Sequence, residues 1–356
     1  MYQKTLKLSI IFIYLIIIAG AVVRMTGSGM GCPDWPKCFG YLVPPTEEAE
    51  LLWKPNVDYK SGQVIIVGES LRVAGQSFTS NTIYDEDNWE TYDKHDYAVF
   101  NVWHTWIEYI NRLVTVLAGI PILFMIIFSF WYWRGRGKLI FASFFVLPLM
   151  GFQAWLGKEV VDSNLLPVKI TIHMVVALLI LALLLYLRFK TKHAGKALAQ
   201  TVPAVETLTR NKTQLRYFKI AISAAVIFTL IQVMLGTQVR QYVDIRVDEV
   251  GYAAKSSWLN PTTLWFYIHR SFSIVVVVIN GYLFWSNRKY QLRFSFMNAI
   301  AACIAIEAFS GIIMYYAHFP FGTQPIHLVI ASILFGLQFY VLLESFWKTK
   351  SVTALS

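Results

Sequence analysis

Residues 324–346 read QPIHLVIASILFGLQFYVLLESF. This run is apolar over about 20 residues, the length of a helix that crosses a bilayer. Pro325 suits the first turn of such a helix, because the N–H that proline lacks has no helical partner there. An ionisable side chain such as that of His327 is energetically unfavourable inside the bilayer unless it faces protein or a bound group. The run therefore predicts a membrane helix that presents an imidazole to the protein interior.

The composition of the 356-residue chain is that of an integral membrane protein. Hydrophobic residues make up 56% of the chain and charged residues only 15%, too few to solvate a large soluble surface. The mean hydropathy is +0.51. The formal net charge of +10 comes from basic residues in short connections between apolar runs, which is typical of topology signals and argues against a nucleic acid partner.

The chain is predicted to be an all-α protein with eight transmembrane helices. They lie at about 8–23, 103–131, 139–156, 168–187, 217–238, 263–285, 294–316 and 324–346. No small-residue cleavage site follows the first run, so we expect it to be a retained helix rather than a signal peptide. Basic residues mark the connections at 134–138, 188–216 and 288–293 and both chain ends as cytoplasmic. The polar segment 25–102 and the loop at 239–262 then face outward.

The chain divides into two similar halves. Residues 20–24, GAVVR, resemble 236–240, GTQVR, and residues 108–112, EYINR, resemble 266–270, FYIHR. Four spans per half give both halves the same orientation, as in repeats related by an axis along the membrane normal. We expect two pseudo-symmetric four-helix bundles. They are residues 1–188, with the long outward loop 25–102, and residues 217–356, joined by a basic cytoplasmic linker at 189–216.

The second half carries a matched pair of histidines. His269 and His327 lie near the outward ends of their helices, at comparable depth, so two imidazoles can face each other in one bundle. Such a pair can take both axial positions of a haem. Zinc is less suitable, because no third and fourth ligand occurs at a fitting spacing. The alternative is a pair of core histidines that serve helix packing.

The first half differs where chemistry would occur. Asn111 stands at the position of His269, and Glu108 stands at the position of Phe266, leaving His173 as the obvious ligand. Glu108 lies on the same helix face as Asn111, and a buried carboxylate there suits proton transfer. The second pocket therefore favours a fixed electron-transfer haem, and the first favours the reaction.

Two further groups of residues lie at the outward helix ends. Arg24, Arg112, Arg240 and Arg270 occur there against the usual charge bias, which favours contact with carboxylates such as haem propionates; snorkelling to lipid headgroups is the alternative. Cys32 and Cys38 follow the first helix. Because the outward face is oxidising in many membranes, we expect a disulfide that closes a tight loop, with two free thiols as the alternative.

With these residues in view, the whole chain resembles the haem A synthase family. The residues that carry the resemblance are the run Gly27-Ser28-Gly29-Met30-Gly31-Cys32-Pro33-Asp34-Trp35-Pro36-Lys37-Cys38 after Arg24, then residues 108–112, 153–173 and 232–240, His269-Arg270 and His327. The family normally has a histidine at the position of Asn111. The loop 25–102 is long for the family.

The resemblance implies that haem O is oxidised to haem A, a methyl group becoming a formyl by successive hydroxylations, for cytochrome oxidase. His269 and His327 would hold a cofactor haem b, while Glu108, Asn111 and His173 would serve catalysis and the substrate haem. The location implied is the bacterial cytoplasmic (inner) membrane. Candidate partners are haem O synthase, an electron donor such as a ferredoxin, and a second copy of the chain in a homo-oligomer. A diheme electron-transfer cytochrome and a haem transporter or chaperone are the competing functions.

Overall fold

The structure is a computed structural model that describes residues 1–68, 70–92, 100–163, 165–193 and 211–353. Within these ranges, eight helices are long and apolar enough to cross a membrane. They are α1 (Tyr2–Thr26), α2 (Val102–Tyr132), α3 (Gly137–Asp162), α4 (Pro167–His193), α6 (Lys212–Val250), α7 (Leu264–Lys289), α8 (Met297–Tyr316) and α9 (Thr323–Thr353). The prediction of a multi-pass helical membrane protein is confirmed. Most of the predicted linker 189–216 lies outside the described residues.

Local signals in the sequence explain where several helices begin and end. Helix α1 ends where Gly27 adopts a left-handed conformation, with φ of 69°, which glycine reaches without steric cost. The side chain of Asn101 accepts hydrogen bonds from backbone N–H groups in the first turn of α2. Pro167 is the first residue of α4, and Pro325 lies in the first turn of α9, as expected for proline.

Helix α6 is longer than its hydropathy predicts. The fall in hydropathy predicts a loop from residue 239, but the helix continues to Val250. Two ion pairs along this polar extension join Arg240 to Asp244 and Arg246 to Glu249. Charge pairs three or four residues apart stabilise a helix that no longer has an apolar environment. The loop therefore begins at Gly251.

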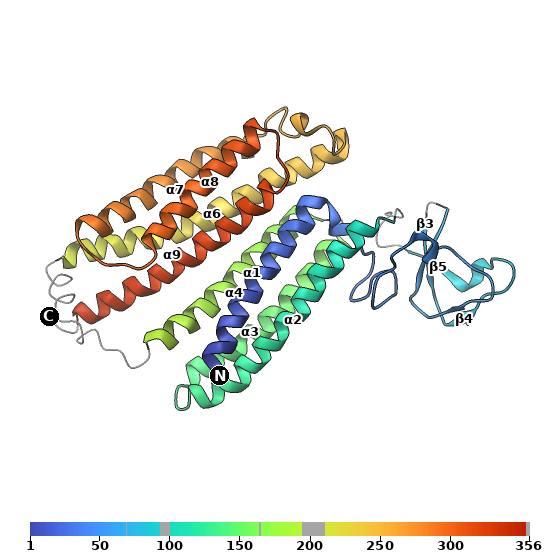
Figure 1. Ribbon diagram of the computed structural model, residues 1–356, viewed down its shortest axis with the longest axis horizontal. Coiled ribbons are helices and arrows are strands. Elements are labelled where there is room, and N and C mark those ends of the chain that lie inside the picture. Colours follow the sequence, from blue (N-terminus) through green and yellow to red (C-terminus); the bar gives the residue numbers. More distant parts are fainter. Residues whose placement is uncertain (69, 93–99, 164, 194–210, 354–356) are drawn as a thin grey trace.

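The helices pack in chain order within each half. Figure 1 shows α1–α4 lying together, with α6–α9 beside them, and the start of α1 and the end of α9 at the helix ends away from the strands. Contacts between the two groups run from α1 and α4 to α9 and from α4 to α6. The pseudo-symmetry of the halves and the cytoplasmic side of the chain ends stay predictions.

The segment between α1 and α2 contains small antiparallel sheets, which the sequence analysis treats only as a polar loop. Strands β2 (Val64–Val67), β3 (Ser70–Ala74) and β5 (Trp89–Thr91) form one sheet, and β1 (Asp58–Tyr59) pairs with β4 (Phe78–Thr79). Side chains alternate between the faces of β2: Val64 and Ile66 pack in the cluster that contains the two cysteines, and Ile65 packs against Trp89. Two small hydrophobic cores stabilise the segment.

Candidate functional site

The histidine pair of the second half meets in space. His269 on α7 and His327 on α9 have ring centres 6.4 Å apart, with their planes inclined by 66°. A metal bound by two facing imidazole nitrogens at about 2.0–2.1 Å each places the ring centres about 6 Å apart. The observed separation therefore fits one metal ion between the rings.

The surroundings of the pair distinguish between kinds of metal site. The described residues contain no group of three or more histidine, cysteine, aspartate or glutamate side chains that could hold a metal ion. A structural zinc site needs four protein ligands, whereas a haem iron brings its own ring nitrogens and takes only axial ligands from the protein. The residues present fit a haem.

Two side chains of α8 approach one of the rings. The Nδ1 atom of His327 lies 2.8 Å from Oγ of Ser310 and 3.2 Å from Oε2 of Glu307. In His269 the corresponding Nδ1 atom is buried and has no hydrogen-bond partner within the described chain. Gln232 donates instead to the backbone oxygen of His269, at 3.0 Å. The two imidazoles therefore have different polar environments.

A glycine lies next to each of the four side chains at the repeat-related positions, which are three histidines and Asn111. A Cβ atom added at each glycine would lie 3.1–3.9 Å from that side chain, which is a tight or an ordinary contact. The pairs are Gly236 with Cε1 of His269 at 3.1 Å, Gly311 with Cε1 of His327 at 3.7 Å, Gly157 with Cε1 of His173 at 3.4 Å, and Gly20 with Oδ1 of Asn111 at 3.9 Å. Small residues let helices and rings approach closely in membrane bundles, so each half provides room for two side chains at these positions.

In the first half these positions hold His173 on α4 and Asn111 on α2. The Nδ1 atom of His173 and the Oδ1 atom of Asn111 are both buried, and neither finds a hydrogen-bond partner in the part of the chain that is described. Gln153 donates to the backbone oxygen of His173, at 3.0 Å. Unpaired polar atoms in a membrane interior are costly, so both side chains are suited to a bound group.

Glu108 lies one turn before Asn111 and contacts the loop after α1. Its Oε2 atom accepts a hydrogen bond from the backbone N–H of Cys32, at 2.9 Å, and its Oε1 atom pairs with Arg112. Arg112 also donates to the backbone oxygens of Asp34, at 2.6 Å, and Lys37, at 2.9 Å. The side chains that the sequence assigns to catalysis and to propionate binding thus also hold this loop.

The loop itself is closed by a disulfide between Cys32 and Cys38. The carboxylate of Asp34 accepts backbone hydrogen bonds from Phe39 and Gly40 across the loop, at 2.5 and 2.9 Å. Burial raises the pKa of Asp34 above its ordinary value, while these two hydrogen bonds act in the opposite direction. The disulfide and the carboxylate of Asp34 together fix the segment that contacts the first turns of α2.

The other predicted arginines fall into two groups. Arg24 and Arg240 share Asp244, at 3.2 and 2.7 Å, and Arg240 also donates to the backbone oxygen of Arg24, at 2.8 Å. Since Arg24 is on α1 and Arg240 on α6, this cluster joins the two halves. Arg270 is exposed and lies 5.9 Å from the ring centre of Phe266; it makes no ion pair with any described residue.

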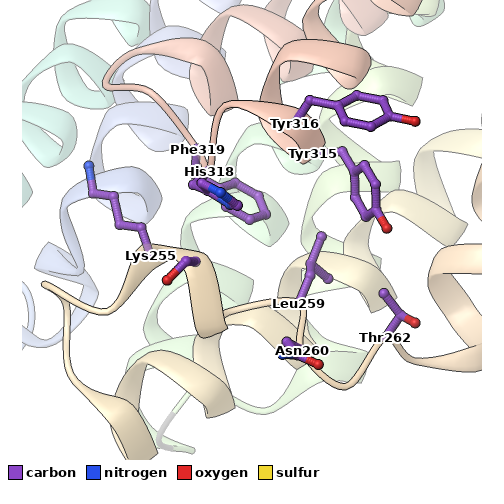
Figure 2. Close-up of a pocket in the computed structure, with 9 residues that line it drawn as sticks. Lys255, Leu259, Asn260, Thr262, Tyr315, Tyr316, His318 and Phe319 are labelled. Carbon is purple, nitrogen blue, oxygen red and sulfur yellow. The ribbon is translucent and has the colours of Figure 1, made fainter.

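A pocket of about 340 Å³ opens at the end of the second half that carries the histidine pair. Figure 2 shows Tyr315 and Tyr316 at the end of α8 and Lys255, Leu259, Asn260 and Thr262 in the connection from α6 to α7, with His318 and Phe319 between α8 and α9. Tyr315 stacks on Phe266, with ring centres 5.0 Å apart. Because Phe266 precedes His269 by less than one helix turn, the pocket lies close to the histidine pair.

Sequence reasoning missed three of these residues. Glu307 could have been found as an ionisable residue within an apolar segment, which is by default a functional candidate. It also precedes His327 by the offset at which Gln153 precedes His173. Ser310 and Asp244 carry no such signal, because their partners are apparent only after the helices have packed.

The fold and the site define a class: a multi-pass membrane protein with one imidazole pair spaced for a metal centre and, in its other half, the imidazole of His173 with a buried Nδ1 atom. The chain belongs to the cytochrome oxidase assembly protein family, COX15-CtaA, whose sequence profile matches residues 3–64 and 81–339. The unmatched stretch between these two ranges, residues 65–80, contains β3, β4 and most of β2.

Individual relatives are similar at low identity. The heme A synthase of Shewanella oneidensis is 26% identical over 189 residues, which cover 52% of this chain and 45% of that protein. The heme A synthase of Wolbachia pipientis is 22% identical over 93% of this chain and 89% of the relative. That of Flavobacterium johnsoniae is 22% identical over 93% of this chain and 94% of the relative. The chain thus matches less than half of the Shewanella protein but nearly all of the other two.

Proposed function

We propose that this protein is a haem A synthase, which oxidises a methyl group of haem O to a formyl group in the bacterial cytoplasmic membrane. Membership of the cytochrome oxidase assembly family and the names of the relatives support the proposal. The observation that carries it is the separation of 6.4 Å between the ring centres of His269 and His327.

In the second half, His269 and His327 would hold a haem b as its two axial ligands. The bound group would supply one-electron transfer, with a potential set by its ligands and their hydrogen bonds. The protein's part is to orient the two rings. Gly236 and Gly311 give the rings room, and Gln232 fixes the backbone of α7 at His269.

In the first half, His173 would bind or orient the substrate haem O, with Asn111 on the facing helix. Each of the two hydroxylations would replace a C–H bond of the methyl group by a C–O bond, a two-electron oxidation that requires an external oxidant and a source of the oxygen atom. Loss of water from the doubly hydroxylated carbon would then give the formyl group. Glu108 would exchange a proton during these steps. A proton on Oε1 of Glu108 would weaken its ion pair with Arg112, so proton exchange and attachment of the Cys32–Cys38 loop are coupled.

The arginines at the helix ends would bind haem propionates. Arg270 is free of ion pairs among the described residues. Arg24 and Arg240 already pair with Asp244, so they would divide their hydrogen bonds between that carboxylate and a propionate. We also propose haem O synthase as the source of the substrate, an electron donor such as a ferredoxin, and a homo-oligomer as candidate partners.

The proposal is tested by the optical spectrum of the purified protein together with extraction and chromatography of its haems. We expect a low-spin b-type spectrum, and haem A when the protein is expressed with a source of haem O. A colourless protein from haem-replete cells, or only unmodified haem O in the extract, would contradict the proposal. Two low-spin bis-histidine haems would instead indicate an electron-transfer cytochrome, which Asn111 disfavours. Ready exchange of haem at both sites would indicate a transporter or chaperone.

A further inference from the structure

The imidazole of His327 has its proton position set by its neighbours on α8. Oε2 of Glu307, 3.2 Å from Nδ1, belongs to a carboxylate, which accepts hydrogen bonds. Ser310 has one hydroxyl proton, and its Oγ lies 3.1 Å from the backbone oxygen of Glu307, so Oγ is left to accept at Nδ1. While Glu307 is ionised, both contacts place the proton on Nδ1 and leave the lone pair on Nε2.

We propose that Glu307 and Ser310 are positioning residues that make His327 the stronger of the two electron-donating ligands in the second half. This inference rests on the proposed haem b between His269 and His327. A hydrogen bond from Nδ1–H to a carboxylate fixes the ring orientation and raises the basicity of the ligating nitrogen. The Nδ1 atom of His269 has no such partner among the described residues, so the two axial ligands are unequal.

Helix packing by itself does not require a carboxylate at this position. In the first half Gln153 occupies the same offset, 20 residues before His173, and donates to the backbone oxygen of His173 instead of contacting its ring. An amide therefore suffices to join α3 to α4. The side chain of Glu307 is largely buried, with 16% of it exposed, and its second oxygen, Oε1, is buried and has no partner in the described chain. Of positions 153 and 307, which lie 20 residues before His173 and His327, only the one in the half with the histidine pair holds a carboxylate, which is costly to bury.

The consequence is electronic. A more basic axial imidazole stabilises the ferric state of a haem relative to the ferrous state, because it donates more electron density to the metal. Glu307 and Ser310 would therefore lower the midpoint potential of the haem in the second half. A haem of low potential readily passes an electron onward, which suits the half that would supply electrons to the other.

The test is potentiometric titration of the low-spin haem in the purified, full-length protein. The variants are Glu307→Gln, which keeps the shape of the side chain, and Ser310→Ala, which removes one oxygen. The control is Glu344→Gln. Glu344 is also a buried carboxylate, on α9, and forms an ion pair with Lys348, about 25 Å along the helix from His327. All four proteins are also compared by their low-spin electron paramagnetic resonance spectra.

We expect both variants to keep the bis-imidazole spectrum and to raise the midpoint potential, with a shift of about tenfold in the ferric-to-ferrous ratio, about 59 mV for one electron. Glu344→Gln should match the wild type. Unchanged potentials in both Glu307→Gln and Ser310→Ala would overturn the inference while leaving the proposed function intact. If Glu307→Gln loses haem, the midpoint potential of Ser310→Ala alone tests the inference, and an unchanged potential in that variant would overturn it. A wild-type protein without a bis-imidazole haem would refute the proposed function itself.

Discussion

Replacing Glu108 by alanine is predicted to loosen the loop closed by Cys32 and Cys38. The carboxylate accepts the N–H of Cys32 and pairs with Arg112, and both side chains of this ion pair are buried, at 5% and 14% exposure. Glu108→Ala removes the only carboxylate within ion-pair distance of Arg112 among the described residues. It also leaves the N–H of Cys32 without its acceptor.

The size of the effect follows from the remaining contacts. Breaking a buried ion pair by removing one partner costs about 3–5 kcal/mol. Arg112 retains its hydrogen bonds to the backbone oxygens of Asp34 and Lys37, so we take the lower end, about 3 kcal/mol. Since about 1.4 kcal/mol corresponds to a factor of ten, the opening equilibrium of the loop should rise about a hundredfold.

Hydrogen exchange measured by mass spectrometry reports this opening directly, on peptides that cover residues 31–40. We expect much faster exchange in Glu108→Ala, a smaller increase in Glu108→Gln, which can still accept from Cys32, and none in Glu344→Gln. The same variant should retain its low-spin haem and lose turnover. Wild-type protection of this loop in Glu108→Ala would refute the anchoring role that we derive from the contacts.

Three further predictions concern the positions related by the repeat and the cluster that joins the halves. Asn111→His should add a low-spin component to the spectrum of haem bound in the first half, because Gly20 leaves room at 3.9 Å; an unchanged spectrum would mean that position 111 does not face the iron. Gly236→Ala should weaken haem binding, since the new Cβ would lie 3.1 Å from His269 and overpacking costs about 1–3 kcal/mol. The matched Gly20→Ala and Gly311→Ala variants, with distances of 3.9 and 3.7 Å, should bind haem normally, and equal haem titrations for all three variants would contradict the steric argument. Asp244→Ala leaves Arg24 and Arg240 without their shared carboxylate, so it should lower the melting temperature of the haem-free protein; an unchanged melting temperature would argue against a role in joining the halves.

The membrane helices are predictable from the sequence because hydropathy and length decide them. The same holds for Pro167 and Pro325, since a proline in the first helical turn costs nothing. The end of α6 is not predictable in this way. Hydropathy falls at residue 239, while the ion pairs of Arg240 and Arg246 carry the helix on to Val250. The short strands between α1 and α2 escape notice for a related reason, because strands of two to five residues offer little periodicity.

The candidate site is only partly predictable. The pairing of His269 with His327 is predictable because each lies within the first two turns of its helix, so both have a comparable depth in the bundle. The contacts of Glu108 and Arg112 with the loop at Cys32 do not follow, since nothing in the local sequence of α2 specifies which part of a long polar segment will return to it. The ion pair between Asp244 and Arg24 is not predictable either, because the two residues are distant along the chain.

The two halves differ in side chains at positions where both have a glycine on the neighbouring helix. Gly20 lies next to Asn111 as Gly236 lies next to His269, so the first half also has room beside position 111. Gln153 stands where the second half has Glu307, and it still bonds to the next helix, but through the backbone of His173 and not through its ring. Both differences remove a group that would strengthen metal ligation in the first half, and neither removes a helix contact. Under the proposed function, an iron held there would rely on His173 as its imidazole ligand, so a haem in the first half would exchange more readily than one held by both His269 and His327.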